Sequence, residues 1–484
     1  MRPRTPFWRI IAVVVALAAA VGIVSASPGP SAAWTGDPLA WVQFGGATGD
    51  VGRTVVPLSD GGLVVGGFFS STVAFGSTTL TSAGSDDAFV ARLGATGEVL
   101  WVVGFGGASV DVVTEVAVDG SGAVTAVGFF GGSITIGSTT LTSAGSRDGF
   151  VARFDANGNA EWALRFGGSS VDSAHDVVAA PDGDVIVGGI VSGAATFASS
   201  VSVPVGSGQG DSDVVVVRLS AAGGIDFLER LGGTDQESFG GLAVGPSGEV
   251  FVGGTFASST MTIASSTVVN VGAKDGFVAE LAANGVPLWS ASCGGVGQDG
   301  VAAVAVDATG GVYVFGEVDG AANCGSVPVA APLGGVDLLL ARFDGDGTTM
   351  WAQRYGGGAN EEARQVARGP DGVLVLAGTT GRADDPSMPF VAAFVVAVDP
   401  GETVRWTATM GGSGYDVAQG VSVDADGYVV VALRFGGGDL DPGPGDLQVT
   451  TAGASDALFV TLAPDGSLAP VVRPRPPVAP AYTG

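Results

Sequence analysis

The sequence predicts an all-β protein, a seven-bladed β-propeller with four strands in each blade. Three observations predict this fold: a glycine-rich loop recurs seven times, short apolar runs accompany every copy, and the two ends of the chain complement one another. The 484 residues include 83 glycines, and 46 % of the chain is hydrophobic. Glycine without a Gly-X-Y period excludes collagen, and the apolar content argues against disorder.

The recurring loop is a Gly-Gly pair, preceded by an aromatic residue and followed four positions later by an acid. The second glycines are Gly46, Gly107, Gly168, Gly233, Gly295, Gly357 and Gly412; the acids are Asp50, Asp111, Asp172, Glu237, Asp299, Glu361 and Asp416; the aromatics are Trp41, Trp101, Trp162, Phe227, Trp289, Trp351 and Trp406. A phosphate-binding loop would lead into a helix, whereas a strand pattern follows each of these loops. We therefore expect them to join consecutive blades, with each acid bonding loop N–H groups.

Each repeat reads as four strands. In the second copy, residues 114–130 contain two apolar runs around a glycine turn, and residues 148–168 contain two more around the sequence DANG. Such pairs of runs predict hairpins. Their nearly continuous apolar character indicates sheets that are covered on both faces. Radially packed four-stranded sheets describe a propeller, whereas an open stack would need polar end caps that the sequence does not contain.

The two ends of the repeat region indicate that the ring closes. The region opens with PLAWVQFGG, an outer strand without inner strands before it, and finishes with three strands whose own fourth contains Pro470. Pairing the Trp41 strand with the last blade would remove a free edge. We therefore expect the propeller to span residues 38–468 and a Pro-rich tail to occupy residues 469–484.

The amino terminus has the layout of a signal peptide. Arg2, Arg4 and Arg9 precede an apolar run over residues 10–24, and Ala26 offers a cleavage site. The run is short for a membrane span. We expect a signal peptide over residues 1–26, a linker over residues 27–37, and a secreted, cell-surface or periplasmic monomer without a membrane span in its mature chain.

Charge and cysteine content limit the possible partners. The net charge is −27, with 47 acidic and 20 basic residues, and a chain of this kind lacks the cationic footprint that nucleic acids require. Cys293 and Cys324 are the two cysteines. They could pair in an exported protein, or Cys293 could simply be a small buried residue.

The repeats resemble the SBBP (β-propeller repeat) family of exported bacterial proteins. The resemblance rests on residues 85–130, which combine the start DAFV, a Trp-containing outer strand, the Gly-Gly loop with its acid and a small turn before valine. It covers about residues 38–468, and the connection GGGDLDPGPGDL is similar to one found in such repeats. Blade six departs from the pattern, with Ala392 in place of the aspartate. The resemblance implies a propeller and export, and no chemistry.

The repeated acids suggest a possible calcium site. Besides the loop acids, an aspartate stands at the start of most third strands: Asp87, Asp148, Asp213, Asp275, Asp337 and Asp456. Both sets should lie at one face, where their oxygens would suit Ca²⁺. The candidates are Asp111 with Asp148, and Asp439, Asp441 and Asp446 in the Pro/Gly-rich connection. The alternative is that each carboxylate caps its own backbone, and no other cofactor is expected.

The single histidine, His175, occupies an offset that varies between copies. Its equivalents are Arg53, Thr114, Gly240, Ala302, Arg364 and Gln419. We expect these side chains at the mouth of the central channel, where Arg53, Glu115, His175, Asp176 and Arg364 would form an asymmetric polar rim. A Ser-His-Asp system would need a serine that the sequence does not identify, and one histidine is poor material for zinc.

Three functional hypotheses follow. The first is an exported, non-enzymatic propeller that binds a protein or glycan, or acts as a surface scaffold, through an acidic, Ser/Thr-rich loop face. The second is a hydrolase or lyase using the channel mouth near His175 and Arg364. The third is a carbohydrate-binding module, although the repeated tryptophans are better explained by packing between blades.

Overall fold

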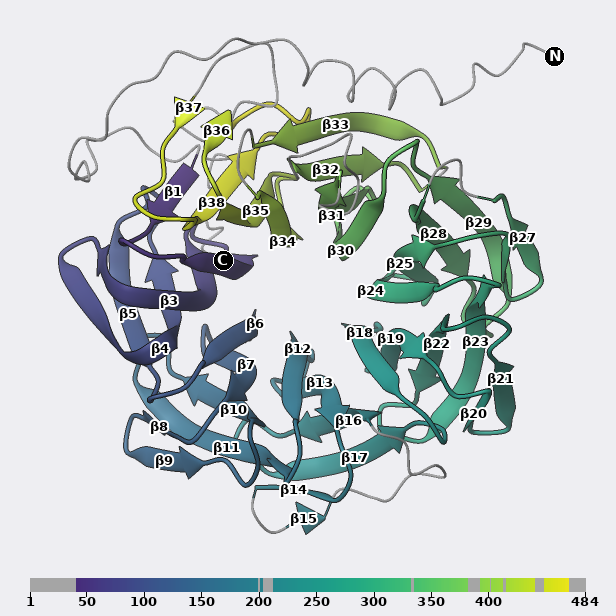
Figure 1. Cartoon of the computed structure of the whole chain (residues 1–484), viewed down its shortest axis with the longest axis horizontal. Helices are drawn as coiled ribbons and strands as arrows, with labels where there is room; N and C mark the ends of the chain where they lie inside the picture. Colours follow the sequence, from purple (N-terminus) through teal and green to yellow (C-terminus); the bar gives the residue numbers. More distant parts are fainter. Residues whose placement is uncertain are drawn as a thin grey trace, which may run out of the picture.

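The computed structural model describes residues 41–198, 201–202, 212–331, 335–381, 392–400, 402–411, 415–439 and 448–469. The expected signal peptide and linker lie outside the described residues, as does the Pro-rich tail beyond Ala469. The described part of the chain is all-β, and its main sheets form a seven-bladed propeller around a central axis (Figure 1). None of its elements is a helix that could cross a membrane.

Every blade is an antiparallel sheet of four principal strands, ordered from the axis outwards. Blade 1 contains β2 (Val51–Pro57), β3 (Leu63–Phe75), β4 (Thr78–Leu93) and β5 (Val99–Phe105); blade 2 contains β6 (Val112–Val118), β7 (Val124–Phe130), β10 (Asp148–Phe154) and β11 (Ala160–Gly168); blade 3 contains β12 (Ser173–Ala179), β13 (Val185–Val191), β16 (Asp213–Leu219) and β17 (Ile225–Leu231); blade 4 contains β18 (Glu237–Val244), β19 (Val250–Phe256), β22 (Asp275–Leu281) and β23 (Pro287–Gly295). Blade 5 contains β24 (Gly300–Val306), β25 (Val312–Val318), β28 (Asp337–Phe343) and β29 (Thr349–Tyr355); blade 6 contains β30 (Glu361–Arg368), β31 (Leu374–Thr380), β32 (Ala392–Val398) and β33 (Val404–Met410); blade 7 contains β34 (Val417–Val423), β35 (Val429–Phe435), β38 (Asp456–Leu462) and β1 (Trp41–Phe44).

Short ribbons decorate the connections between second and third strands. They are β8 (Ser133–Ile136) with β9 (Thr139–Thr142), β14 (Ala195–Phe197) with β15 (Val201–Ser202), β20 (Thr260–Ile263) with β21 (Ser266–Val269), β26 (Ala322–Cys324) with β27 (Val327–Val329), and β36 (Gly438–Asp439) with β37 (Gln448–Val449). The ribbons β14–β15 and β26–β27 each extend the sheet of the preceding blade. In blade 1 the corresponding ribbon is formed by the end of the long strand β3 and the start of the long strand β4.

The ring closes as the sequence predicts. The strand β1 pairs antiparallel with β38, with Trp41 opposite Val460 and Phe44 opposite Ala457. Phe44 is 5 % exposed, and its ring centroid lies 4.6 Å from that of Phe75 in the neighbouring blade. The first strand of the chain therefore completes the last blade and leaves the ring without an open joint between its ends.

The repeated tryptophans pack between blades. Trp101, on the outer strand of blade 1, donates its indole N–H to the carbonyl of Ala156 in the β10–β11 turn of blade 2 at 3.0 Å. Its ring covers Gly158 of the same turn, where an added Cβ would lie only 2.8 Å from the indole. Trp162 and Trp406 make the equivalent bonds to Ala221 and Pro464. These contacts agree with the predicted packing role, because the polar edge of each ring is used within the protein.

The loop acids hold two connections together. Asp111 accepts hydrogen bonds from the backbone N–H of Gly107 in its own loop, at 2.6 Å, and of Gly131 in the connection after β7, at 3.1 Å. Asp50, Asp172 and Asp299 make the same pair of bonds in their blades. The Gly-Gly loops are therefore architectural, and their acids cap the backbone.

Candidate functional site

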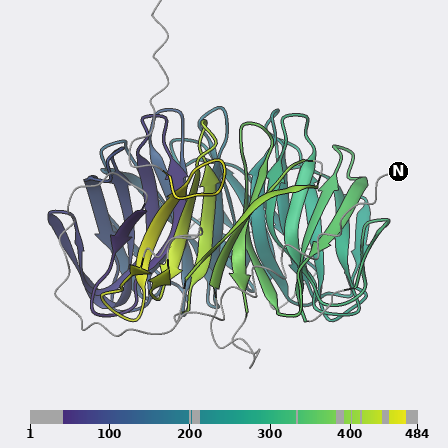
Figure 2. The same ribbon diagram turned by 90° about the horizontal axis from the view of Figure 1, so that it is seen from above.

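The propeller has two chemically different ends. Because the strands alternate in direction, the blade-to-blade loops and the second-to-third-strand connections lie at one end, here named the loop end. The hairpin turns between first and second and between third and fourth strands lie at the other, the turn end. Figure 2 shows the ring from the side, with strands running between the two ends.

The acidic rings expected at the loop end are internal. Asp111, Asp148 and Asp172 are fully buried, and Asp87 is 4 % exposed. The ring carboxylates therefore do not form the predicted acidic surface, because they satisfy buried N–H groups and do not face solvent. Exposed acids occur at both ends. They include Asp235 and Asp319 at the loop end, and Asp60, Asp182, Asp371, Asp426 and Asp465 on the hairpin turns of the turn end.

The calcium candidates do not assemble into a site. Asp111 uses both carboxylate oxygens within the loops, while Asp148 accepts a hydrogen bond from the N–H of Ala144 and pairs with Arg165. No group of three or more His, Cys, Asp or Glu side chains that could hold a metal occurs among the described residues. Asp441 and Asp446 lie outside those residues, and Asp439 ends the short strand β36.

The variable offset that includes His175 is a β-bulge in the innermost strand of every blade. The pairing register between first and second strands shifts at Arg53, Thr114, His175, Gly240, Ala302, Arg364 and Gln419. A bulged residue is released from the ladder and its side chain is re-aimed, which is why bulges are frequent beside functional sites. The seven blades thus present seven equivalent positions, with different side chains, near the loop end of the axis.

The residues that follow the bulges connect neighbouring blades. Thr54 Oγ1, Asp176 Oδ2 and Gln365 Oε1 accept hydrogen bonds from the backbone N–H of Val116, Leu242 and Val421, each on the next blade, at 3.3, 2.7 and 2.7 Å. Gln365 Nε2 also donates to Glu115 Oε2 at 3.3 Å, which joins blade 6 to blade 2. We name Thr54, Glu115, Asp176 and Gln365 the axial network.

The acids of the axial network are not a freely charged rim. Burial, together with repulsion from the nearby Asp176 carboxylate, raises the pKa of Glu115 to about 8. Burial also raises the pKa of Asp176 to about 6. Glu115 is therefore mostly protonated at neutral pH, and it contributes hydrogen bonds rather than charge to the axis.

His175 is packed against neighbouring side chains rather than projecting freely into the channel mouth. Burial, then repulsion from Arg147 and Arg53, lowers its pKa to about 4. Its ring stacks on Phe239 with centroids 5.9 Å apart, and Nε2 lies 2.8 Å from Ser173 Oγ. This serine was not among the predicted site residues, although its position two residues before His175 on the same strand could have indicated it. Ser173 is fully buried, so a substrate could not reach its hydroxyl.

Four arginines gather at the loop end. Arg53 and Arg364 are bulge residues, Arg434 lies near the end of β35, and Arg147 directly precedes β10. We name these four the arginine arc, because they belong to blades 1, 6, 7 and 2. Arg147 and Arg434 were not predicted as site residues, since they stand outside the repeated loop motif.

A hollow lies at the turn end, between blades 5 and 6. It has a volume of about 440 Å³ and is lined by Asp307, Tyr313, Arg342, Trp351, Arg368 and Pro400. Arg342 donates to Asp307 at 2.9 Å and lies over the ring of Tyr313. Two of its charged side chains therefore neutralise one another, which makes this hollow a weaker candidate than the loop end.

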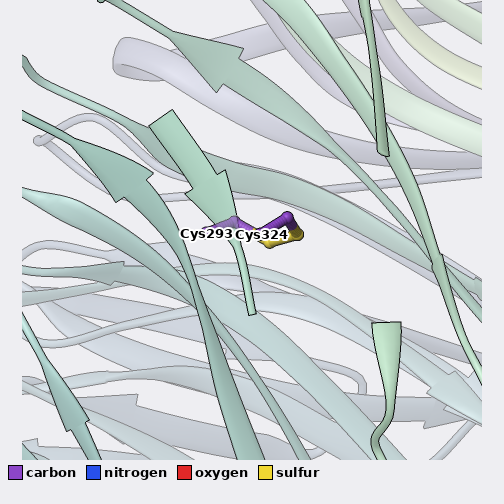
Figure 3. Close-up of a disulfide and its surroundings, with 2 residues drawn as sticks. All are labelled: Cys293 and Cys324. Carbon is purple, nitrogen blue, oxygen red and sulfur yellow. A yellow bond between two sulfur atoms is a disulfide. The ribbon is translucent and has the colours of Figure 1, made fainter. Parts of the chain in front are cut away.

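The two cysteines form a disulfide between blades 4 and 5. Cys293 on β23 and Cys324 on β26 are opposite one another and buried, and their sulfurs are bonded (Figure 3). The bond ties the outer strand of blade 4 to the ribbon that follows β25 of blade 5. Its position on paired strands indicates a structural role.

These features define a seven-bladed β-propeller whose loop end carries bulged, blade-specific side chains around the axis. No family model matches the chain. A segment of 182 residues, 36 % of the chain, is 29 % identical to the regulatory protein FlaEY of Caulobacter vibrioides, and it spans 19 % of that protein's length.

Three solved structures are similar at low sequence identity. A protein of unknown function from Dyadobacter fermentans is 12 % identical, covers 87 % of this chain and 98 % of its own, and gives a TM-score of 0.37. The extracellular domain of a putative hybrid two-component system from B. thetaiotaomicron is 9 % identical, with 85 % and 39 % coverage and a TM-score of 0.41. A gluconolactonase from Xanthomonas campestris is 15 % identical, with 69 % and 85 % coverage and a TM-score of 0.32. None of these likenesses assigns an activity.

Proposed function

We propose that this protein is an exported, non-enzymatic binding propeller that takes its ligand at the loop end, around the bulged inner strands. The observation that carries the proposal is the difference among seven structurally equivalent bulges, which range from Gly240 and Ala302 to Arg53, His175 and Arg364. Export rests on the amino-terminal sequence pattern and on the resemblance to the SBBP repeats.

The physical argument separates folding from recognition. The Gly-Gly loops, their acids and the outer tryptophans have the same role in blade after blade, because each blade must close against its neighbour. A bulged residue escapes the ladder, so pairing does not constrain its side chain. Blade-specific side chains on a rigid frame are what a recognition surface requires.

Binding is favoured over hydrolysis by the state of His175. A general base works best with a pKa near the operating pH, and burial holds the pKa of His175 down at about 4. The adjacent Ser173 is fully buried. The carbohydrate-binding alternative loses its best support, because the indole N–H groups of Trp101, Trp162 and Trp406 already bond to neighbouring turns.

A pair of variants in blade 5 tests the location of the site. Ala302→Phe places a large side chain at a half-buried bulge position of the loop end, and Ala308→Phe places the same side chain on an exposed turn at the other end. The immobilised protein would be exposed to small molecules and glycans from culture medium, and the retained compounds identified by mass spectrometry. We expect Ala302→Phe to reduce retention at least about tenfold and Ala308→Phe to leave it unchanged. The reverse pattern, or release of chemically altered compounds, would contradict the proposal.

A further inference from the structure

Most arginines of the ring pair with acids, and this holds at both ends: at the loop end Arg165 pairs with Asp148, and Arg230 pairs with Asp213. At the turn end, arginines are neutralised by acids: Arg153 pairs with Asp119 and Glu161, and Arg405 pairs with Asp371 and Asp399. The chain carries 47 acids against 20 basic residues, so acidic partners are abundant. The arginine arc nevertheless stands largely without them.

Arg53 is the most isolated member of the arc. Within the described part of the chain it makes no hydrogen bond or ion pair, and its Nε is buried without a partner. Its guanidinium lies over the ring of Phe68, 5.9 Å from the centroid. A cation over an aromatic face is stabilised by the ring, but its N–H donors remain available to another acceptor.

Arg147 repeats this arrangement on blade 2. Its guanidinium lies 4.2 Å from the centroid of Phe129, which occupies the same place on the second strand as Phe68 does in blade 1. Arg147 Nε is also buried without a hydrogen-bond partner. Arginine–phenylalanine pairs on two adjacent blades thus each contain a buried Nε without a hydrogen-bond partner.

The remaining two members have only weak or lateral partners. Arg434 lies over Tyr415, 5.2 Å from its centroid, and donates from Nε to Ser455 Oγ at 3.3 Å. Arg364 pairs with Glu362 at 2.6 Å, while its Nε is buried without a partner. Tyr415 is 44 % exposed, so the arc is bordered by an accessible aromatic face.

Three members of the arc, Arg53, Arg364 and Arg434, repel one another. Burial, together with repulsion from Arg364 and Arg434, lowers the pKa of Arg53 to about 10. The acids nearby are already engaged: Glu317 accepts the N–H of Ala363 at 2.9 Å, and burial raises the pKa of Glu115 to about 8. Like charges held together in this way are costly unless an anion compensates them.

We propose that the arginine arc of Arg53, Arg147, Arg364 and Arg434 binds the oxyanion group, carboxylate or phosphate, of a small soluble ligand. The proposal rests on the loop-end binding function and names the chemistry of its ligand. Planar guanidinium groups match the geometry of carboxylates and phosphates and bind them through paired hydrogen bonds. The exposed ring of Tyr415 would contact the uncharged part of the ligand.

The test uses anions of defined chemistry on the mature chain. Inorganic phosphate and succinate would be titrated by calorimetry and by thermal unfolding, against sodium chloride at matched ionic strength, since a ligand of the native state raises the unfolding midpoint. Comparing the two titrations shows whether the site prefers a phosphate or a carboxylate. We expect one of the two to bind, with affinity at least tenfold weaker in Arg53→Gln, and in Arg147→Gln, which lies outside the sheets.

Arg405→Gln is the control, because it removes an arginine of the turn end, where Asp371 and Asp399 pair with it. Equal binding to Arg53→Gln and Arg405→Gln, or no effect beyond that of chloride, would overturn the anion proposal. Neutral sugars tested in parallel distinguish failure of the anion proposal from failure of the loop-end binding function. A sugar that binds wild type but not Ala302→Phe would preserve the binding function while refuting the anion, and a protein that binds at the turn end alone would refute both.

Discussion

Replacing Arg165 by methionine should reveal how the buried acids of a blade are tolerated. Arg165 on β11 pairs with Asp148, and the two side chains are 12 % and 0 % exposed. Burial and the nearby Asp148 carboxylate raise the pKa of the adjacent Asp172 above its usual value, although hydrogen bonds from Gly168 and Ser192 and the Arg165 guanidinium act to lower it. Arg165→Met keeps much of the aliphatic stem and removes the charge.

The expected loss of stability is large. Removing one partner of a buried ion pair typically costs about 3–5 kcal/mol, because the other charge stays buried without compensation. The matched control is Arg92→Met, since Arg92 pairs with Asp60, whose side chain is 52 % exposed. A pair so open to solvent contributes about 1 kcal/mol or less.

Urea unfolding at pH 8 and at pH 5 measures both effects. Loss of Arg165 removes one of the groups that lower the pKa of Asp172, so more of this buried acid is protonated at pH 5 than in wild type. The destabilisation should therefore be smaller at pH 5 than at pH 8. If Arg165→Met and Arg92→Met lose the same free energy of unfolding at both pH values, the proposed neutralisation of the buried acids is wrong.

Three further predictions concern the whole ring. Burial raises the folded-state pKa of Asp111 to about 6 and of Glu361 to about 7. The stability that protonation of these acids contributes is therefore complete below about pH 4 and is lost as the pH rises to 7. The melting temperature should fall from pH 5 to pH 8, and a rise would contradict this prediction. Reduction of the Cys293–Cys324 bond, which closes a 31-residue separation, should lower the free energy of unfolding by about 2–4 kcal/mol in a urea titration, and an unchanged midpoint would show that the bond is dispensable. Phe44→Ala should cost about 3–5 kcal/mol because it empties the closing joint, whereas a loss below about 1 kcal/mol would mean that β1 does not hold the ring.

The fold could be predicted because its signals are local and repeated. A Gly-Gly pair, an acid four residues later and an outer tryptophan recur in register, and repetition removes the ambiguity that one copy would leave. Closure of the ring could be predicted by counting strands in each repeat, because the strand of Trp41 had no blade of its own and the last blade lacked an outer strand.

The site could be predicted only in part, because the repeated sequence pattern does not determine the direction in which a side chain points. The sequence placed Asp111 and Asp148 at the correct end but not their orientation, which is decided by N–H groups converging from two connections. It selected Arg53 and Arg364 from the variable offset, but the bulge that makes this offset special is a property of strand pairing. Arg147 joins them only because the ring brings separate blades together.

Loop-end binding is tested most directly by finding where a ligand contacts the ring. Hydrogen–deuterium exchange, measured with and without a ligand retained in the screen, reports that contact residue by residue. Protection is predicted in the bulged segments of β2 and β30 and before β10, around Arg53, Arg364 and Arg147, with the hairpin turn of Asp371 unchanged. Protection confined to the hairpin turns or the outer strands would contradict the account.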